Sequence, residues 1–283
     1  DIPVDDPDQA ATEPAEVDYL LGVLREVFPR LPFERRNVLY TYVGVRPLAR
    51  SAADKPGRIS REHSVEIDPP NAKRDIAMVC LVGGKWTTFR SLSEQATDEV
   101  LRLLGRPRQR STEQLSIGGG AALPTNAQAM DAFLSRMQAT CRMSRQRAAN
   151  FVGRYGTLAP ALAERLAVAG NDPLQHAPDY SVAELRHLCF DTGVVHLADL
   201  VLRRTLIAIS GKVTDALLAE LADIAAEALG WDAARRSQEL HACAELLRER
   251  HGVTLSMPEM PHRRGAAFDA SLPADSLSDA LPT

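Results

Sequence analysis

The sequence predicts an α+β protein in which a strand-bearing region precedes an all-helical region. Three short runs rich in β-branched residues occur before residue 83, whereas residues from about 125 to 251 place apolar side chains at helical spacing. The chain has 283 residues, of which 45% are hydrophobic and 25% charged. That is enough material for about two domains, each with its own core.

The first region is expected to mix helix and strand. Residues 15–30 have apolar side chains on one helical face, and two prolines end the run. The β-like runs are 38–43, 64–67 and 76–82. The last is apolar at nearly every position, so we expect a strand buried in a sheet that is covered on both sides. A helix over 86–104 follows it after a glycine turn.

The second region is expected to be a bundle of helices. The helical stretches lie near 126–138, 144–154, 158–169, 181–189, 196–209, 213–229 and 232–250. Gly230 suits the position just after a helix, and Asp232 suits the N-cap of the next one. Gly118–Gly120 is interpreted as a hinge. Residues 255–283 are rich in Pro, Ser, Ala and Asp, which predicts a disordered tail.

Composition excludes several classes of function. With 33 basic and 37 acidic residues, the net charge of −4 disfavours general nucleic-acid binding. No apolar run approaches the roughly 20 residues that cross a bilayer. The acidic start has no basic segment typical of a signal peptide. The expected location is therefore cytoplasmic.

The four cysteines do not form a recognisable metal or disulfide pattern. Cys80, Cys141, Cys189 and Cys243 are isolated, with no C-x-x-C pair and no histidine at finger spacing. We expect reduced, mostly buried thiols and no metal site. No constellation of residues for nucleophilic catalysis is recognisable, and the catalytic base stays unknown.

The turn Gly83–Thr88 is the first candidate for ligand binding. It joins a buried strand to a helix whose first N–H groups have no internal partner and whose dipole is positive at that end. Glycines let a ligand approach the backbone, and Lys85 adds a full charge, which suits a phosphate or an electron-rich flavin edge. Trp86 follows the lysine, so this is not a Walker A loop. The alternative is an ordinary turn capped by threonine.

Two arginines form the second candidate. Arg46 follows the first β-like run and precedes a proline, and Arg61 stands at the start of the second run. Arginines at neighbouring strand ends can hold a phosphate or carboxylate. The alternative is that both are solvated or paired with glutamates. Asp199 and Arg203 are interpreted as a structural i,i+4 ion pair.

Several motifs in order resemble the FAD-dependent glycerol-3-phosphate dehydrogenases. These are Glu16–Leu21, Gly44–Leu48, Ser60–His63, Gly83–Lys85 with Thr87–Arg90, Gly118–Gly120, Tyr155-Gly156, and Asp199 with Arg203–Thr205. The resemblance covers about residues 1–250. It implies a partial FAD-dependent oxidoreductase (glutathione-reductase-like) substrate/FAD domain over 1–110, followed by an all-α C-terminal domain over 111–254.

Two departures from the family pattern are visible. The G-x-G-x-x-G turn that binds the ADP part of FAD is absent. The start of the chain resembles a point midway through the family's substrate domain, so the resemblance implies a C-terminal portion. Near Asp199 the family has an acidic residue where this chain has Thr192–His196.

The resemblance also implies a reaction and roles for residues. sn-Glycerol 3-phosphate would be oxidised to dihydroxyacetone phosphate with FAD as cofactor and quinone as electron acceptor. Arg46 and Arg61 would bind the substrate. The flavin would be bound by the glycine turn. Its expected cofactor-binding residues are Gly83, Gly84, Lys85, Trp86 and Thr87.

Alternatives remain open at this point. One is a glycerol-3-phosphate oxidase that passes electrons to oxygen, and another is a non-catalytic helical interaction module. The resemblance is also compatible with peripheral contact at the inner face of the membrane and with a homodimer.

Overall fold

A computed structural model describes residues 4–45, 62–83, 85–141, 143–168, 170 and 172–256. Its helices are α1 Pro14–Val27, α2 Phe89–Leu103, α3 Ala127–Cys141, α4 Arg145–Tyr155, α5 Ala159–Ala167, α6 Val182–Asp191, α7 Leu197–Asp199, α8 Asp215–Leu229 and α9 Ala233–His251. Its strands are β1 Ser64–Asp68 and β2 Met78–Val82. The order of elements confirms a small strand-bearing region followed by an all-helical one.

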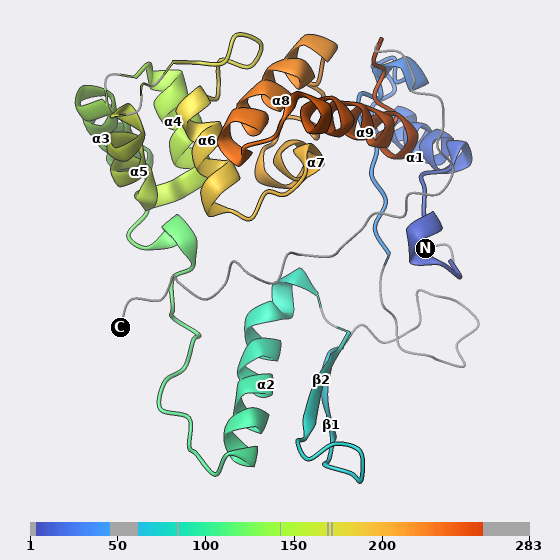
Figure 1. The fold of residues 1–283 in the computed structure, drawn as a ribbon, viewed down its shortest axis with the longest axis vertical. Coiled ribbons are helices and arrows are strands. Elements are labelled where there is room, and N and C mark those ends of the chain that lie inside the picture. Colours follow the sequence, from blue (N-terminus) through green and yellow to red (C-terminus); the bar gives the residue numbers. More distant parts are fainter. Residues whose placement is uncertain are drawn as a thin grey trace.

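Helices α3–α9 form one body that occupies the upper part of Figure 1. One apolar cluster gathers α3, α4 and α5, and a larger one gathers α6 to α9. Side-chain caps set the helix starts, as at Ser181, whose hydroxyl accepts the amide of Glu184. The two predicted punctuation residues are confirmed: Gly230 ends α8 with φ 68°, and the Asp232 carboxylate accepts the amide of Arg235.

The strands form a hairpin beside α2, set apart from the helical body in Figure 1. The antiparallel register pairs Ser64 with Val82 and Asp68 with Met78. Helix α2 packs on the hairpin, which leaves Met78 and Leu81 exposed. The expectation of a strand buried on both faces is therefore wrong for the described residues, because a single helix covers this two-stranded sheet.

The run 38–43 is not a strand, contrary to its β-like composition. Its backbone bonds to the end of α9 instead: the Thr41 amide donates to the His251 carbonyl at 3.0 Å, and the His251 ring donates to the Thr41 carbonyl at 2.9 Å. The rings of Tyr40 and His251 stack with centroids 4.7 Å apart. The apolar and aromatic side chains that suggest a strand serve to dock this segment on a helix end.

The predicted helix over 196–209 is interrupted. After α7 the chain makes a π-helical turn, Leu200–Arg204, and becomes extended at Thr205. The buried Thr205 hydroxyl contacts the carbonyls of Leu200 at 3.0 Å and Val201 at 3.3 Å, so a side chain takes over carbonyls that the helix would otherwise use. The predicted helix is too long because a threonine at this position ends it.

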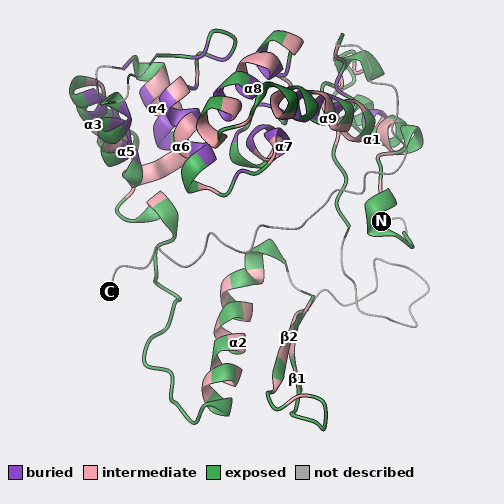
Figure 2. Cartoon of the chain, in the orientation of Figure 1, coloured by how far each residue is buried: buried purple, intermediate pink, exposed green. Residues whose placement is uncertain are grey.

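Burial is concentrated in the helical body, as Figure 2 shows. Among the described residues before Leu134, Leu21 alone is buried. Trp86 is 91% exposed, and α1 exposes large apolar residues such as Tyr19 and Leu20. The described part of the strand-bearing region therefore has no hydrophobic core of its own.

The thiols behave as expected. All four cysteines are free, and Cys141, Cys189 and Cys243 are buried. Burial raises the pKa of Cys243 to about 12, so this thiol is inert at neutral pH. In the described part of the chain, no cluster of ligating side chains could hold a metal ion, and no helix is long and apolar enough to cross a membrane.

Candidate functional site

The glycine turn follows β2, as the sequence predicts. Gly83 has φ +71°, a backbone conformation that residues with a Cβ rarely adopt. A Cβ there would also lie 3.0 Å from the Glu62 carbonyl oxygen. Any residue other than glycine would therefore strain the turn from β2 toward α2 at this point.

Residues 85–88 form the second part of the turn and lead into the N-terminal end of α2. The Lys85 amide donates to the Thr88 hydroxyl at 3.1 Å, and the Thr88 amide donates to the Lys85 carbonyl at 3.0 Å. The amides of Trp86 and Thr87 donate to no described residue, and Lys85, Trp86 and Thr87 are all exposed. Amides without an acceptor among the described residues, the positive end of a 15-residue helix and a lysine together favour an anion or an electron-rich ring edge.

The structure does not test the rest of this predicted site. Arg46, Arg61 and Gly84 lie outside the described residues. That the two arginines and Lys85 converge on one cleft therefore stays a prediction.

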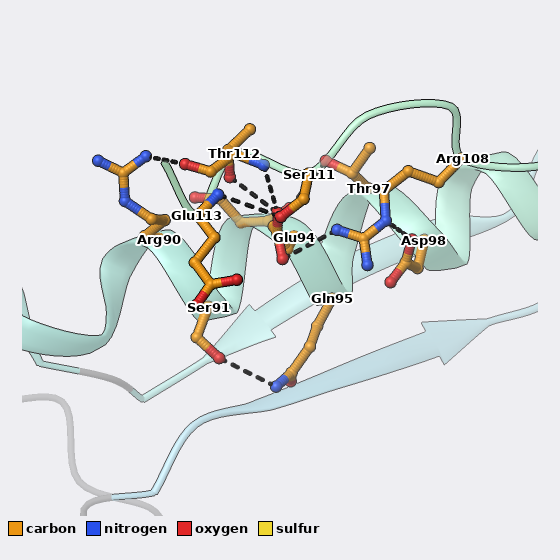
Figure 3. A network of polar contacts seen from close by, with 11 residues as sticks. Arg90, Ser91, Glu94, Gln95, Thr97, Asp98, Arg108, Ser111, Thr112 and Glu113 are labelled. Carbon is orange, nitrogen blue, oxygen red and sulfur yellow. Dashed lines mark hydrogen bonds and ion pairs between the residues drawn. The ribbon is translucent and has the colours of Figure 1, made fainter. Parts of the chain in front are cut away.

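A network around Glu94 fastens α2 to the segment that follows it (Figure 3). The Glu94 carboxylate forms an ion pair with Arg108 at 2.9 Å. It also accepts hydrogen bonds from the Ser111 hydroxyl at 2.7 Å and the Thr112 amide at 2.5 Å. The Arg108 guanidinium, helped by Ser111 and Thr112, lowers the pKa of Glu94 to about 2. The segment 108–112 is thus attached to the helix that follows the glycine turn.

Gly118–Gly120, expected to be a hinge, is a close crossing of two backbones. A Cβ on Gly119 would lie 1.9 Å from the Tyr155 carbonyl oxygen, and one on Gly156 would lie 2.2 Å from the Gly119 carbonyl oxygen. The Thr157 hydroxyl is 3.1 Å from the Gly119 carbonyl and 2.8 Å from that of Ala121. Gly119 and Gly156 allow two backbone segments to pack closely, rather than providing flexibility. The crossing attaches the segment before α3 to the end of α4.

A buried polar group that the sequence analysis missed joins the two apolar clusters. Arg154 of α4 pairs with the fully buried Glu184 of α6 at 2.8 Å, and its guanidinium carbon lies 4.2 Å from the centroid of the Tyr180 ring. The Tyr155 hydroxyl donates to Glu184 at 2.9 Å. Burial raises the pKa of Glu184, and Arg154 opposes that shift. Partners 30 residues apart on different helices leave no local signal in the sequence.

The predicted ion pair between Asp199 and Arg203 is present, at 2.8 Å. The other Asp199 oxygen accepts the amides of Val195 at 3.1 Å and His196 at 2.9 Å. The His196 ring in turn lies 2.9 Å from the Glu239 carboxylate. Asp199 therefore caps the short helix α7 as well as pairing with Arg203, which supports its structural interpretation.

Comparison with known proteins agrees with the motif order. Residues 110–236 match the family described as the C-terminal domain of alpha-glycerophosphate oxidase. The chain is 30% identical over 241 residues to glycerol-3-phosphate dehydrogenase 2 of Mycobacterium tuberculosis, a match that covers 82% of this chain and 38% of that protein. It is 26% identical over 201 residues to the aerobic glycerol-3-phosphate dehydrogenase of Escherichia coli, covering 71% of this chain and 39% of that protein.

A solved structure shares the fold. The Bacillus halodurans glycerol-3-phosphate dehydrogenase, complexed with FAD, superposes with a TM-score of 0.68 at 20% identity, over 87% of this chain and 47% of that one. The chain thus spans less than half the length of these relatives. Because the helical domain, the ordered motifs and the matched regions agree, we conclude that residues 110–236 form the domain that this family model describes, and that the chain is similar to the C-terminal part of glycerol-3-phosphate dehydrogenases.

Proposed function

We propose that this chain forms part of an FAD-dependent enzyme that oxidises sn-glycerol 3-phosphate to dihydroxyacetone phosphate. The observation that carries the proposal is the Gly83–Thr88 turn, with its positive φ, open amides and exposed lysine at the start of α2. The oxidation removes two electrons and two protons from the substrate alcohol, and quinone is the acceptor that we propose.

The residues of the turn fit a flavin. Gly83 brings the backbone close without a side chain, and the Trp86 and Thr87 amides can donate to ring oxygen or nitrogen atoms. When bound, FAD supplies the group that accepts a hydride from the substrate carbon. Lys85 would stabilise negative charge on the neighbouring ring edge. The ADP part of FAD would be bound by a dinucleotide-binding portion outside this chain.

In this proposal Arg46 and Arg61 hold the phosphate of the substrate. Bidentate guanidinium groups match phosphate geometry, and fixing that end orients the carbinol carbon for reaction. Their test is Arg46→Ala in the assembled enzyme. Loss of one charge-assisted contact should lower kcat/KM by about tenfold to a hundredfold and shift the melting temperature by only a few degrees.

The proposed function can be tested by complementation. The chain is co-produced with the N-terminal portion of the Mycobacterium tuberculosis relative that precedes the matched region, and co-purification and flavin absorbance report assembly. We expect substrate-dependent reduction of a soluble quinone, slowed at saturating substrate by Lys85→Ala and unaffected by Arg136→Gln on α3. An assembled, colourless complex without activity would contradict the proposal and favour a non-catalytic helical module.

An oxidase is the second candidate, because the matched family is described from alpha-glycerophosphate oxidase. Activity assays on the same assembled complex distinguish an oxidase from a dehydrogenase. Rapid oxygen consumption with peroxide formation in the absence of quinone would identify an oxidase, whereas slow oxygen consumption with fast quinone reduction identifies a dehydrogenase.

A further inference from the structure

A cavity of about 590 Å³ opens in the helical domain, remote in sequence from the glycine turn. Its walls come from α4, the loop before α6, α6 itself and the segment that begins in the π-helical turn. This volume is in the range of sites for small ligands. The proposed oxidation does not use this cavity.

Four basic side chains line the cavity. They are Arg154, Arg203, Arg204 and Lys212. Three of them have a carboxylate partner within 2.8 Å. The partners, in the same order, are Glu184 for Arg154, Asp199 for Arg203 and Asp179 for Lys212. The positive charge of these three is therefore largely balanced.

Arg204 is the exception. Its Nε donates to the Thr192 carbonyl at 2.8 Å, and it forms no ion pair with any residue that the structure describes. Its backbone is held by the π-helical turn, which the buried Thr205 hydroxyl closes behind it. A fixed, unbalanced guanidinium at the wall of a cavity favours binding of an anion.

A second group on the wall points to the same chemistry. The Tyr180 side chain is buried, since 5% of the residue's surface is exposed, and its hydroxyl oxygen accepts the Leu206 amide at 3.0 Å. The phenolic proton itself has no acceptor among the described residues. A buried O–H without an acceptor costs free energy unless a ligand or water accepts it.

We propose that this cavity binds a small organic anion through Arg204 and Tyr180. The phosphate or carboxylate of the ligand accepts from the Arg204 guanidinium and from the Tyr180 hydroxyl. Lys212 stays paired with Asp179 at 2.6 Å, so the net attraction for the anion comes from Arg204. Leu188 and Ile207 offer an apolar wall for a carbon body. This site is separate from the turn proposed for flavin, and it does not depend on the chain being part of an oxidoreductase.

The test uses the whole 283-residue chain and inorganic phosphate, with acetate as a second anion and glycerol as a neutral probe. Isothermal titration calorimetry should show saturable phosphate binding that depends on Arg204, with a Kd on the order of 1 mM. Arg204→Gln should weaken binding by about tenfold or more, because it removes a charge-assisted contact. Tyr180→Phe should weaken it too, with Tm measured to confirm folding. Comparison of phosphate with acetate separates a phosphate-selective site from a carboxylate-selective one.

Two matched controls locate the site. Arg136→Gln removes the same charge from an exposed position on α3 and should leave binding within about twofold. Lys85→Ala alters the glycine turn and should leave the Arg204-dependent binding unchanged. The proposal is overturned if no saturable binding of either anion occurs, if Arg204→Gln and Arg136→Gln behave alike, or if Lys85→Ala alone abolishes binding.

Discussion

At the scale of single residues, the crossing of Gly119 and Gly156 shows how a position can require glycine without special backbone angles. Gly119 has φ −75°, which any residue can adopt, yet the Tyr155 carbonyl occupies the place of its side chain. The requirement is steric and comes from a segment far along the chain. Flexibility, which the run of three glycines suggests, is not what this position uses.

Gly119→Ala should destabilise the helical domain by about 1–3 kcal/mol, because the added methyl forces two backbones apart. Gly153→Ala is the matched control. Gly153 lies inside α4, and no atom comes within 4 Å of the place that an alanine Cβ would take, so alanine should stabilise the helix by about 0.5–1 kcal/mol. Urea denaturation of both variants provides the measurement. Equal effects of the two substitutions would contradict the crossing.

At the scale of elements, α2 and its following segment depend on the charge of Glu94. The pKa of this carboxyl is lowered to about 2, so the attachment is complete above the ordinary pKa of a glutamate and is lost as pH falls through about 2. An NMR titration of the Glu94 side-chain carboxyl carbon should give this low midpoint. Arg108→Gln should raise it, since Arg108 is the largest cause of the shift, whereas Arg102→Gln should not. A midpoint near the ordinary value of 4.5 in the unmodified protein would refute the network.

The polar contact between α4 and α6 depends on the buried ion pair Arg154–Glu184. Glu184→Gln keeps the shape of the side chain but leaves the Arg154 charge without its carboxylate, which should cost about 3 kcal/mol or more. Glu227→Gln is the matched control, because it breaks the exposed pair with Arg186 and should cost about 1 kcal/mol or less. Thermal unfolding followed by circular dichroism distinguishes the two. Similar melting temperatures would show that the buried pair contributes little.

The elements that the sequence predicts well are those decided locally. Periodic apolar positions and caps such as Gly230 and Asp232 indicate the helices, and the paired glycines indicate the turn after β2. The sequence does not predict the structure of residues 38–43, because their partner is the end of α9. His251, which contacts Thr41, lies 210 residues further along the chain. The same applies to the cavity, whose wall combines Tyr180 and Arg204 from separate segments. The backbone of Arg204 is held by a π-helical turn that no local sequence pattern indicates.

At the scale of the whole molecule, the contrast between the two regions determines what the isolated chain can do. Residues before Leu134 that the structure describes bury almost nothing, although they carry the glycine turn. A turn held this loosely supplies few of the contacts from which binding energy for a dinucleotide comes.

The isolated 283-residue chain should therefore bind FAD weakly. We expect a Kd above about 1 µM in a titration that follows quenching of flavin fluorescence. FMN, which lacks the adenylate, is the matched control and should bind about as weakly, because the adenylate contacts are the ones that we place outside the chain. A Kd for FAD below about 1 µM would contradict this expectation.

The docking of residues 8–41 on the end of α9 has a consequence for how the protein is made. Arg250 donates to the carbonyls of Asp8 and Ala10, and His251 to that of Thr41, across separations of 210 residues or more. A ribosome that adds about 5–20 residues per second takes on the order of tens of seconds to cover that distance. Residues 8–10 and 40–41 therefore lack these partners until the last helix has been made. During synthesis these contacts are therefore among the last in the fold to form.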